Sequence, residues 1–289
     1  LQLSVEVPGE QAETAAEAFT AAGALSVTLL DAGDEPLLEP APGETPLWSS
    51  NRIVALFTPE TDVAQVQERL REIFPGERIK VHQELLEDRD WSNTWREGFG
   101  EMQFGRRLWV CPVGEAPPDP EAIVVHLDPG LAFGTGTHTT TGFCLEWLDA
   151  NPPAGKRVLD YGCGSGILAI AACRLGADRV HAVDIDPQAL QATRENAARN
   201  GVADSLEVTL PGELAAGQFD LVMANILANP LIGLAGEIAA RVHTGGQLIM
   251  TGILAEQGTA VMAAYSDWFA FGPPLTREEW VLLAGVKTA

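Results

Sequence analysis

Asp160, Asp184 and Asn225 each end an apolar run, where the sequence is best suited to bind a ligand. Asp160 ends the run 157–160 and is followed by glycines at positions 162, 164 and 166. Glycines at this spacing allow a tight turn that a ligand can approach closely, and the N-terminus of the following helix favours an anionic ligand group. Asp184 ends the next run, at the separation where an acid reaches the hydroxyls of a ribose.

Asn225 ends the apolar run 219–226, and its side-chain carbonyl can accept a hydrogen bond. Together with nearby backbone carbonyls, this oxygen could hold an amine with its lone pair aimed at a methyl group. The alternative role is turn formation before Pro230, which suits Asn229 better.

The spacing of the glycines separates two classes of cofactor. A dinucleotide site requires G-x-G-x-x-G, whereas here the third glycine comes one residue early and Ile167 occupies the sixth position. This disfavours an NAD-dependent enzyme. The glycine turn, the preceding Asp160 and the second-strand Asp184 together resemble the S-adenosylmethionine site of class I methyltransferases.

The segment 127–141, LDPGLAFGTGTHTTT, is rich in glycine and threonine and has no helix or strand periodicity. Such a segment is typical of a loop that covers a ligand. We expect Phe133 to pack on the ligand and Thr141, at the start of the next helix, to donate to a carboxylate. The alternative is that the threonines only cap the helix 142–148, through Thr139 or Thr140. His138 is not chosen as a base, because a lone loop histidine is more often structural or exposed.

Residues 1–87 predict a small N-terminal domain with the order βαββαβ, which is the ferredoxin-like pattern. Strands are expected at 2–7, 25–31, 53–57 and 79–83, with helices at 10–22 and 62–74. None of these residues suggests catalysis. We therefore interpret the domain as a recognition module for the substrate rather than as a simple cap.

Residues 88–120 predict a linker helix and a hairpin. Trp91 and Trp95 lie one turn apart on the helix 88–100, and we interpret them as anchors to the second domain rather than as substrate contacts. The runs 107–111 and 123–127 are expected to be short strands that pair as the hairpin.

Residues 121–289 predict an α/β domain, because strands alternate with helices. Strands are expected at 157–160, 179–185, 206–210, 219–226, 248–252 and 280–286, with helices from about 165 and at 187–200, 230–242 and 255–267. The result is a doubly wound, Rossmann-like sheet. Ligands of such sheets bind at the carboxyl ends of the strands, which is where the glycine turn, Asp184 and Asn225 fall.

The composition limits the partners. The chain has 289 residues, with 18 Lys and Arg against 40 Asp and Glu, which gives a net charge of −22. This charge argues against a nucleic-acid surface, which needs basic residues, and favours a basic protein partner. The alternative is that acidity only maintains solubility.

The four cysteines form no C-x-x-C pair, so we expect neither a disulfide framework nor a metal site. No apolar run is long enough to cross a membrane, and no signal peptide is recognised. We therefore expect a cytoplasmic protein without membrane contact. We also expect a monomer, because the sequence shows no long apolar face.

Six motifs, taken in order, resemble the PrmA family of bacterial ribosomal protein methyltransferases over the full length of the chain. They are LEPAPGETPLW, EDRDWSNTWREGF, DPGLAFGTGTHTTT, LDYGCGSGILAIAA, VDIDPQAL and ANILANP. All class I methyltransferases share the glycine turn, whereas FGTGTHTTT combined with ANILANP is much more specific.

The resemblance implies transfer of methyl groups from S-adenosylmethionine to protein amines. The family acts on lysine side chains and the N-terminal α-amine of large-subunit ribosomal protein eleven, so this basic protein is the implied partner. By motif, Thr141, Gly162, Asp184 and Asn225 would contact the cofactor. Asn225 would lie between cofactor and acceptor amine as the catalytic residue.

Gly164 and Phe133 complete the cofactor-binding set that we expect from the turn and the loop. Three other functions stay open. A class I methyltransferase for another protein or a small molecule would share the same cofactor half. A nucleic-acid methyltransferase is disfavoured by the acidic charge and the separate N-terminal domain, and a non-catalytic cofactor-binding adaptor is disfavoured by Asn225.

Overall fold

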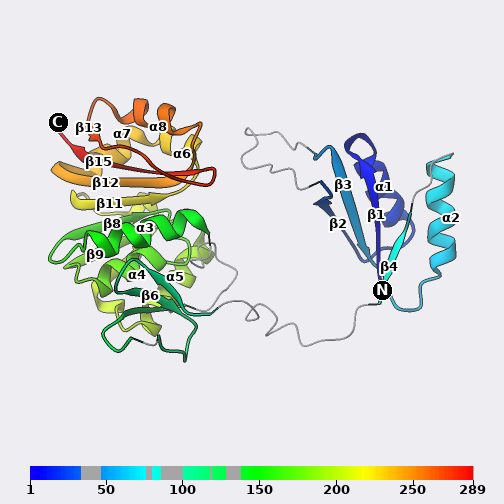
Figure 1. Ribbon diagram of the computed structural model, residues 1–289, viewed down its shortest axis with the longest axis horizontal. Coiled ribbons are helices and arrows are strands. Elements are labelled where there is room, and N and C mark those ends of the chain that lie inside the picture. Colours follow the sequence, from blue (N-terminus) through cyan, green and yellow to red (C-terminus); the bar gives the residue numbers. More distant parts are fainter. Residues whose placement is uncertain (34–46, 76–79, 86–99, 118, 128–137, 289) are drawn as a thin grey trace. The chain divides into compact units, whose positions relative to one another are not determined.

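The structure is a computed structural model that describes residues 1–33, 47–75, 80–85, 100–117, 119–127 and 138–288 (Figure 1). The chain divides into two compact units, Leu1–Asp90 and Trp91–Ala289. Residues 88–99 of the predicted helix, with its two tryptophans, lie outside the described residues, as does Phe133. The domain limits at 87 and 120 stay predictions.

The first unit is a four-stranded antiparallel sheet with the strand order β2-β3-β1-β4. Its elements are β1 (Gln2–Pro8), α1 (Gly9–Ala21), β2 (Ser26–Asp31), β3 (Ser50–Leu56), α2 (Val63–Ile73) and β4 (His82–Glu84). Alternate residues of β1 and β3 are buried with residues of both helices in one core, so α1 and α2 cover the same face. The predicted ferredoxin-like fold is confirmed.

The second unit begins with a small sheet in the order β5-β6-β7, formed by β5 (Met102–Phe104), β6 (Leu108–Cys111) and β7 (Ile123–His126). The prediction that the runs 107–111 and 123–127 form a hairpin is wrong, because β6 and β7 pair in parallel. Residues 112–122 separate them, about the dozen residues that a parallel crossover needs.

The hairpin lies one strand earlier, between β5 and β6. Gly105 adopts a left-handed φ of 74° in its turn. The buried carboxylate of Asp149 accepts hydrogen bonds from the backbone of Arg106 (2.6 Å) and Arg107 (3.3 Å), which fixes that turn.

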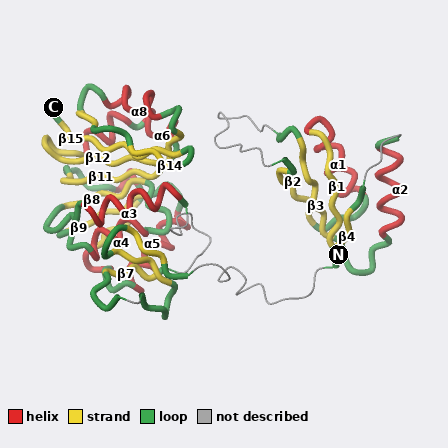
Figure 2. Tube along the Cα trace, in the orientation of Figure 1, coloured by secondary structure: helices red, strands yellow, loops and turns green. Residues whose placement is uncertain are grey.

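The main sheet of the second unit has eight strands within the described residues, in the order β10-β9-β8-β11-β12-β15-β13, with β14 paired to β15 (Figure 2). The strands are β8 (Arg157–Tyr161), β9 (Arg179–Val183), β10 (Leu206–Thr209), β11 (Phe219–Asn225), β12 (Val242–Leu254), β13 (Phe269–Phe271), β14 (Leu275–Arg277) and β15 (Trp280–Lys287). The run from β10 to β12 is parallel, and β15 is antiparallel to β12.

Helices cover both faces of this sheet, which confirms the doubly wound architecture. One core contains residues of α3 (Thr139–Ala150), α4 (Ile167–Arg174) and α5 (Pro187–Arg199). The opposite core contains residues of α6 (Ala228–Gly233), α7 (Ala235–Arg241) and α8 (Gly258–Tyr265). Among the described helices, none is both long and apolar enough to cross a membrane.

Two predicted elements in this region differ from the structure. The helix predicted at 230–242 is the pair α6 and α7, which meet at Leu234 between two glycines, Gly233 and Gly236, that weaken a continuous helix. Strand β12 is longer than the predicted 248–252: it begins at Val242 and continues past Gly252, which adopts a left-handed φ of 81° at a register shift.

Asp220 and His243 form a charged pair that links β8, β11 and β12 at the edge of the sheet where these strands begin. Asp220 accepts a hydrogen bond from the backbone N–H of Arg157 (2.7 Å) and pairs with Nε2 of His243 (2.8 Å). The other ring nitrogen of His243 lies 2.7 Å from the carbonyl of Thr244. Only the protonated imidazole can donate to both oxygens, so these bonds raise the pKa of His243.

This pair predicts a pH-dependent contribution to stability. Because the pKa of His243 is raised on folding, its stabilisation is complete below the unfolded pKa of about 6.5 and is lost as pH rises through the folded value. The pair is partly exposed, so we expect His243→Gln to lower the free energy of unfolding by less than about 1 kcal/mol at pH 5.5. Urea unfolding at pH 5.5 and 8.5 measures the difference, and an equal loss at both pH values would contradict the assignment.

Candidate functional site

The carboxyl ends of β8, β9 and β11 bring the predicted polar residues to one edge of the main sheet. The backbone N–H groups of Gly162 and Cys163 donate to the carbonyl of Val183 at the end of β9 (2.8 and 3.0 Å). The N–H of Gly164 donates to the Asp184 carboxylate (2.9 Å). The glycine turn and the second-strand acid are therefore one hydrogen-bonded unit.

The three glycines of the turn are required by the backbone and by packing. Gly162, Gly164 and Gly166 have φ values of 81°, 53° and 79°, in the left-handed region that favours glycine. A Cβ at Gly162 would collide with the side chain of Ile226, which follows Asn225. The turn after β8 thus packs directly against the segment that carries Asn225.

Ile226 also fixes this segment from the other side. A Cβ at Gly252 in β12 would lie 2.6 Å from the carbonyl oxygen of Ile226, so only glycine admits this approach. Ile226 is therefore held between Gly162 of the turn after β8 and Gly252 of β12. These contacts set the position of the neighbouring Asn225.

Asp184 is half-buried, and both of its carboxylate oxygens accept backbone hydrogen bonds. One bond comes from Gly164, and the other comes from Asp186 (3.0 Å). Each carboxylate oxygen retains a further lone pair, so this acceptor can also receive the two hydroxyls of a ribose. The next side chain, Ile185, is 83% exposed and offers an apolar surface beside the acid. Sequence reasoning missed this side chain, although its place after the strand-end acid was visible.

Asp160 is 1% exposed, and its Oδ2 accepts a hydrogen bond from the N–H of Ala169 in α4 (3.0 Å). Its Oδ1 is buried and has no hydrogen-bond partner among the described residues. Burial, opposed by the bond from Ala169 and aided by the charge of Asp184, raises the pKa of this carboxyl to about 7. A buried acceptor beside the turn fits a ligand that brings an N–H or ammonium group.

Asn225 is half-buried at the end of β11, and its Nδ2 donates to the hydroxyl oxygen of Thr141 (3.4 Å), which is fully buried. Nδ2 and Oδ1 branch from the same carbon, so with Nδ2 on Thr141 the carbonyl oxygen points in a different direction. The structure therefore brings together two residues that the sequence placed on different motifs. Contact of Thr141 with a ligand carboxylate stays a prediction.

The N-terminus of α3 is capped by a histidine rather than by a threonine. Nδ1 of His138 accepts from the backbone N–H of Thr140 (3.3 Å), and its ring packs edge-on against Trp280 at 5.0 Å. The predicted capping by Thr139 or Thr140 is wrong, because the residue before the helix has an extended backbone that aims the imidazole at the first turn. Thr139 instead donates to the Glu278 carboxylate (2.8 Å), so β15 and the turn before it hold the helix that carries Thr141.

Comparison with known proteins places this arrangement in a family. The family model described as ribosomal protein L11 methyltransferase (PrmA) matches residues 1–288. The chain belongs to this family. The ribosomal protein L11 methyltransferase of Methylococcus capsulatus is 54% identical over 288 residues, covering 99% of this chain and 98% of that protein. The enzyme of the same description from Pseudomonas aeruginosa is 49% identical over 290 residues, covering 100% and 99%.

A solved structure supports the fold assignment. The crystal structure of ribosomal protein L11 methylase from Lactobacillus delbrueckii subsp. bulgaricus matches with a TM-score of 0.61 and 32% identity, covering 66% of this chain and 100% of that one. The resemblance stated from the motifs is confirmed, as is the class I methyltransferase fold.

Proposed function

We propose that this chain transfers methyl groups from S-adenosylmethionine to amines of ribosomal protein L11, the large-subunit protein eleven. The observation that carries the proposal is the family match over residues 1–288, combined with the convergence of the glycine turn, Asp184 and Asn225 on one sheet edge. The acceptor amines are lysine side chains and the N-terminal α-amine.

Each residue of the site binds a different part of the cofactor. Asp184 accepts the ribose hydroxyls, and Ile185 covers an apolar part of the ligand. Asp160 offers its unpartnered buried oxygen to the ammonium group of the methionine portion, which lies against the glycine turn. When bound, S-adenosylmethionine supplies a methyl group already activated by a sulfonium.

Asn225 positions the acceptor. Its carbonyl oxygen, directed away from Thr141, accepts an N–H of the incoming amine and aligns the lone pair for in-line displacement. Ile226 and the partly exposed Leu227 adjoin it, so the amine enters an apolar surrounding. Desolvation there lowers the amine pKa from the usual value of about 10.4 and favours the neutral nucleophile. No side chain is needed as a dedicated base.

The N-terminal unit recognises the protein substrate. We assign this role to residues 1–87, with residues 88–120 as the connection and residues 121–289 as the methyltransferase domain. The face of its sheet opposite α1 and α2 carries exposed side chains of Glu6, Thr28, Leu30 and Arg52. The net charge of −22 favours a basic protein and disfavours direct binding of nucleic acid or of an anionic membrane.

The four cysteines are free thiols in the structure. We propose that the enzyme works as a monomer in the cytoplasm, where thiols stay reduced.

A methyl-transfer assay tests the proposal. The full chain is incubated with labelled S-adenosylmethionine and purified large-subunit ribosomal proteins that include L11, and intact-mass analysis follows the products. We expect mass increments of one methyl on L11, and peptide mapping should assign them to lysines and the N-terminus. Transfer to a different protein of the large subunit would show that this protein, and not L11, is the acceptor. Cofactor binding without transfer to any amine would contradict the activity.

A further inference from the structure

Helix α5 carries a row of buried polar side chains on the face that packs toward the cofactor turn. Thr193 is fully buried and Asn196 is 5% exposed, and both follow the strand-end acid Asp184 on one helix. Buried polar groups are costly unless they are hydrogen-bonded, so their partners indicate why this helix face is not apolar.

Both side chains donate to backbone oxygens of the glycine turn. Thr193 Oγ1 donates to the carbonyl of Gly164 (2.9 Å), and Asn196 Nδ2 donates to the carbonyl of Ser165 (2.9 Å). These carbonyls lie just before α4 begins, and the N–H of Ala169, four residues after Ser165, donates to Asp160 instead. A peptide unit is planar, so fixing the Gly164 carbonyl toward α5 directs the N–H of Ser165 away from it.

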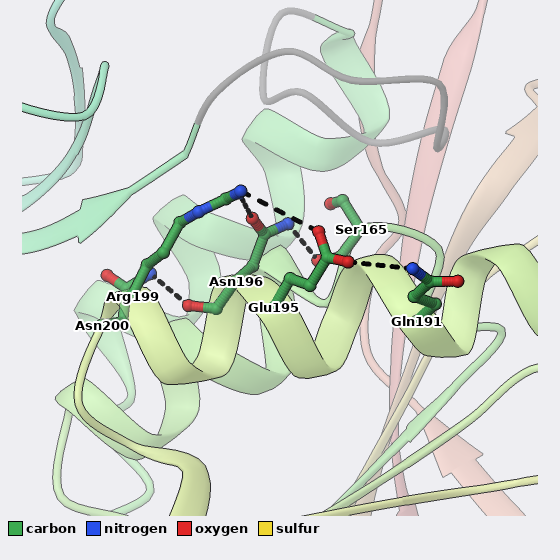
Figure 3. A network of polar contacts seen from close by, with 6 residues as sticks. All are labelled: Ser165, Gln191, Glu195, Asn196, Arg199 and Asn200. Atoms are coloured by element: carbon green, nitrogen blue, oxygen red, sulfur yellow. Dashed lines mark hydrogen bonds and ion pairs between the residues drawn. The ribbon is translucent and has the colours of Figure 1, made fainter.

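The orientation of the Asn196 amide is itself fixed by a chain of contacts along α5 (Figure 3). Arg199 donates to Asn196 Oδ1 (2.9 Å), which leaves Nδ2 aimed at Ser165. Arg199 also pairs with Glu195 (3.8 Å), and Glu195 accepts from Gln191 (3.0 Å). The exposed side chains of Gln191, Glu195 and Arg199 therefore determine which end of the Asn196 amide faces the turn.

We propose that Thr193 and Asn196 are positioning residues for the cofactor: they hold the glycine turn in its binding shape through the Gly164 and Ser165 carbonyls. The inference rests on the proposed function of that turn. The same carbonyls belong to the loop whose Gly164 N–H is bound by Asp184, so α5 and β9 clamp the turn from two sides.

Two substitutions at Thr193 separate positioning from packing. Its Cγ2 methyl lies 2.7 Å from where a Cβ on Gly166 would stand, so the methyl packs on the turn while the hydroxyl bonds to it. Thr193→Val keeps the packing and removes the donor, whereas Thr193→Ser keeps the donor and removes the methyl. We expect Thr193→Val to raise the Kd for S-adenosylhomocysteine about tenfold, as for a buried acceptor that loses its partner. We expect Thr193→Ser to stay within about twofold of wild type, and the reverse order would overturn the proposal.

A matched pair of asparagines provides the second test. Asn200 is also buried at the end of α5, but its amide bonds to the backbone N–H and carbonyl of His126 in β7 (both 2.7 Å), not to the turn. Asn196→Asp replaces the donor to Ser165 by an acceptor and should raise the Kd about tenfold, with kcat at saturating cofactor within about twofold. Asn200→Asp should lower the thermal midpoint while the Kd changes less than twofold. An equal rise of Kd in both variants would mean that the asparagines serve stability alone.

Calorimetric titration of the full-length chain with S-adenosylhomocysteine needs no acceptor protein. If the wild type binds but the Kd values of the Thr193 and Asn196 variants do not change as expected, only this inference is overturned. Absence of binding by the wild type would overturn the cofactor assignment and this inference together.

Discussion

Replacing Asn225 with alanine is expected to lower kcat about a hundredfold, while the Kd for S-adenosylhomocysteine changes less than about threefold. The amide stands at the end of β11 with Nδ2 on Thr141, and the proposed role assigns its carbonyl oxygen to the acceptor amine. Removing it leaves the turn and Asp184 unchanged, because neither of them bonds to the Asn225 side chain in the structure. The loss therefore falls on alignment of the amine rather than on cofactor binding.

Single-turnover rates with ribosomal protein L11 and calorimetric titration with S-adenosylhomocysteine measure the two effects separately. Asn229→Ala is the matched control, because this exposed asparagine lies in the first turn of α6, four residues after Asn225. It should leave both quantities within about twofold. Equal losses of kcat and of cofactor affinity in Asn225→Ala would contradict the amine-positioning role.

The convergence of the site was predictable because it follows from one topological rule. Asp160, Asp184 and Asn225 each end an apolar strand, and the strands that carry them are parallel neighbours in the order β9-β8-β11. Parallel strands expose their carboxyl ends on the same edge, so residues at those ends must meet. Local sequence was sufficient here because each residue marks its own strand end.

Contacts between distant segments could not be predicted in the same way. Thr193 and Asn196 lie in the run PQALQATRENAARN, where their polarity suggests a solvated helix face. Only the packing of α5 against the turn shows that both are buried and bonded to its carbonyls. The sequence also gives no sign that Ile226 packs between Gly162 and Gly252, because this contact joins three segments that are far apart in sequence.

The sequence did not predict the parallel pairing of β6 and β7 or the capping of α3 by His138, for a related reason. Strand direction depends on the path of the connecting segment, and pattern alone does not give that path. The capping of α3 depends on the backbone angles of His138, which are extended and aim its ring at the helix. Residue type favoured the threonines there, whereas geometry selected the histidine.

Replacing Asp184 with alanine is expected to raise the Kd for S-adenosylhomocysteine at least about a hundredfold, which is more than the tenfold effects expected at Thr193 and Asn196. Hydrogen bonds to a charged acceptor contribute about 1.5 to 3 kcal/mol each, and two ribose hydroxyls would lose theirs. The variant also releases the Gly164 N–H, so the turn loses one of the three hydrogen bonds that hold it to the end of β9. With saturating cofactor, kcat should fall much less than in Asn225→Ala.

Asp186→Ala is the control for Asp184→Ala, since the two acids are two residues apart and Asp186 only caps α5 through the N–H of Gln188 (2.8 Å). Loss of that cap should cost about 1 kcal/mol of stability and leave the Kd within about twofold. A ligand analogue without ribose hydroxyls sharpens the test. It should bind the wild type much more weakly than S-adenosylhomocysteine does, whereas Asp184→Ala should bind the analogue and S-adenosylhomocysteine with similar affinity. If the hydroxyls contribute equally in both proteins, the diol is not bound by Asp184, and the acid serves only to hold the turn.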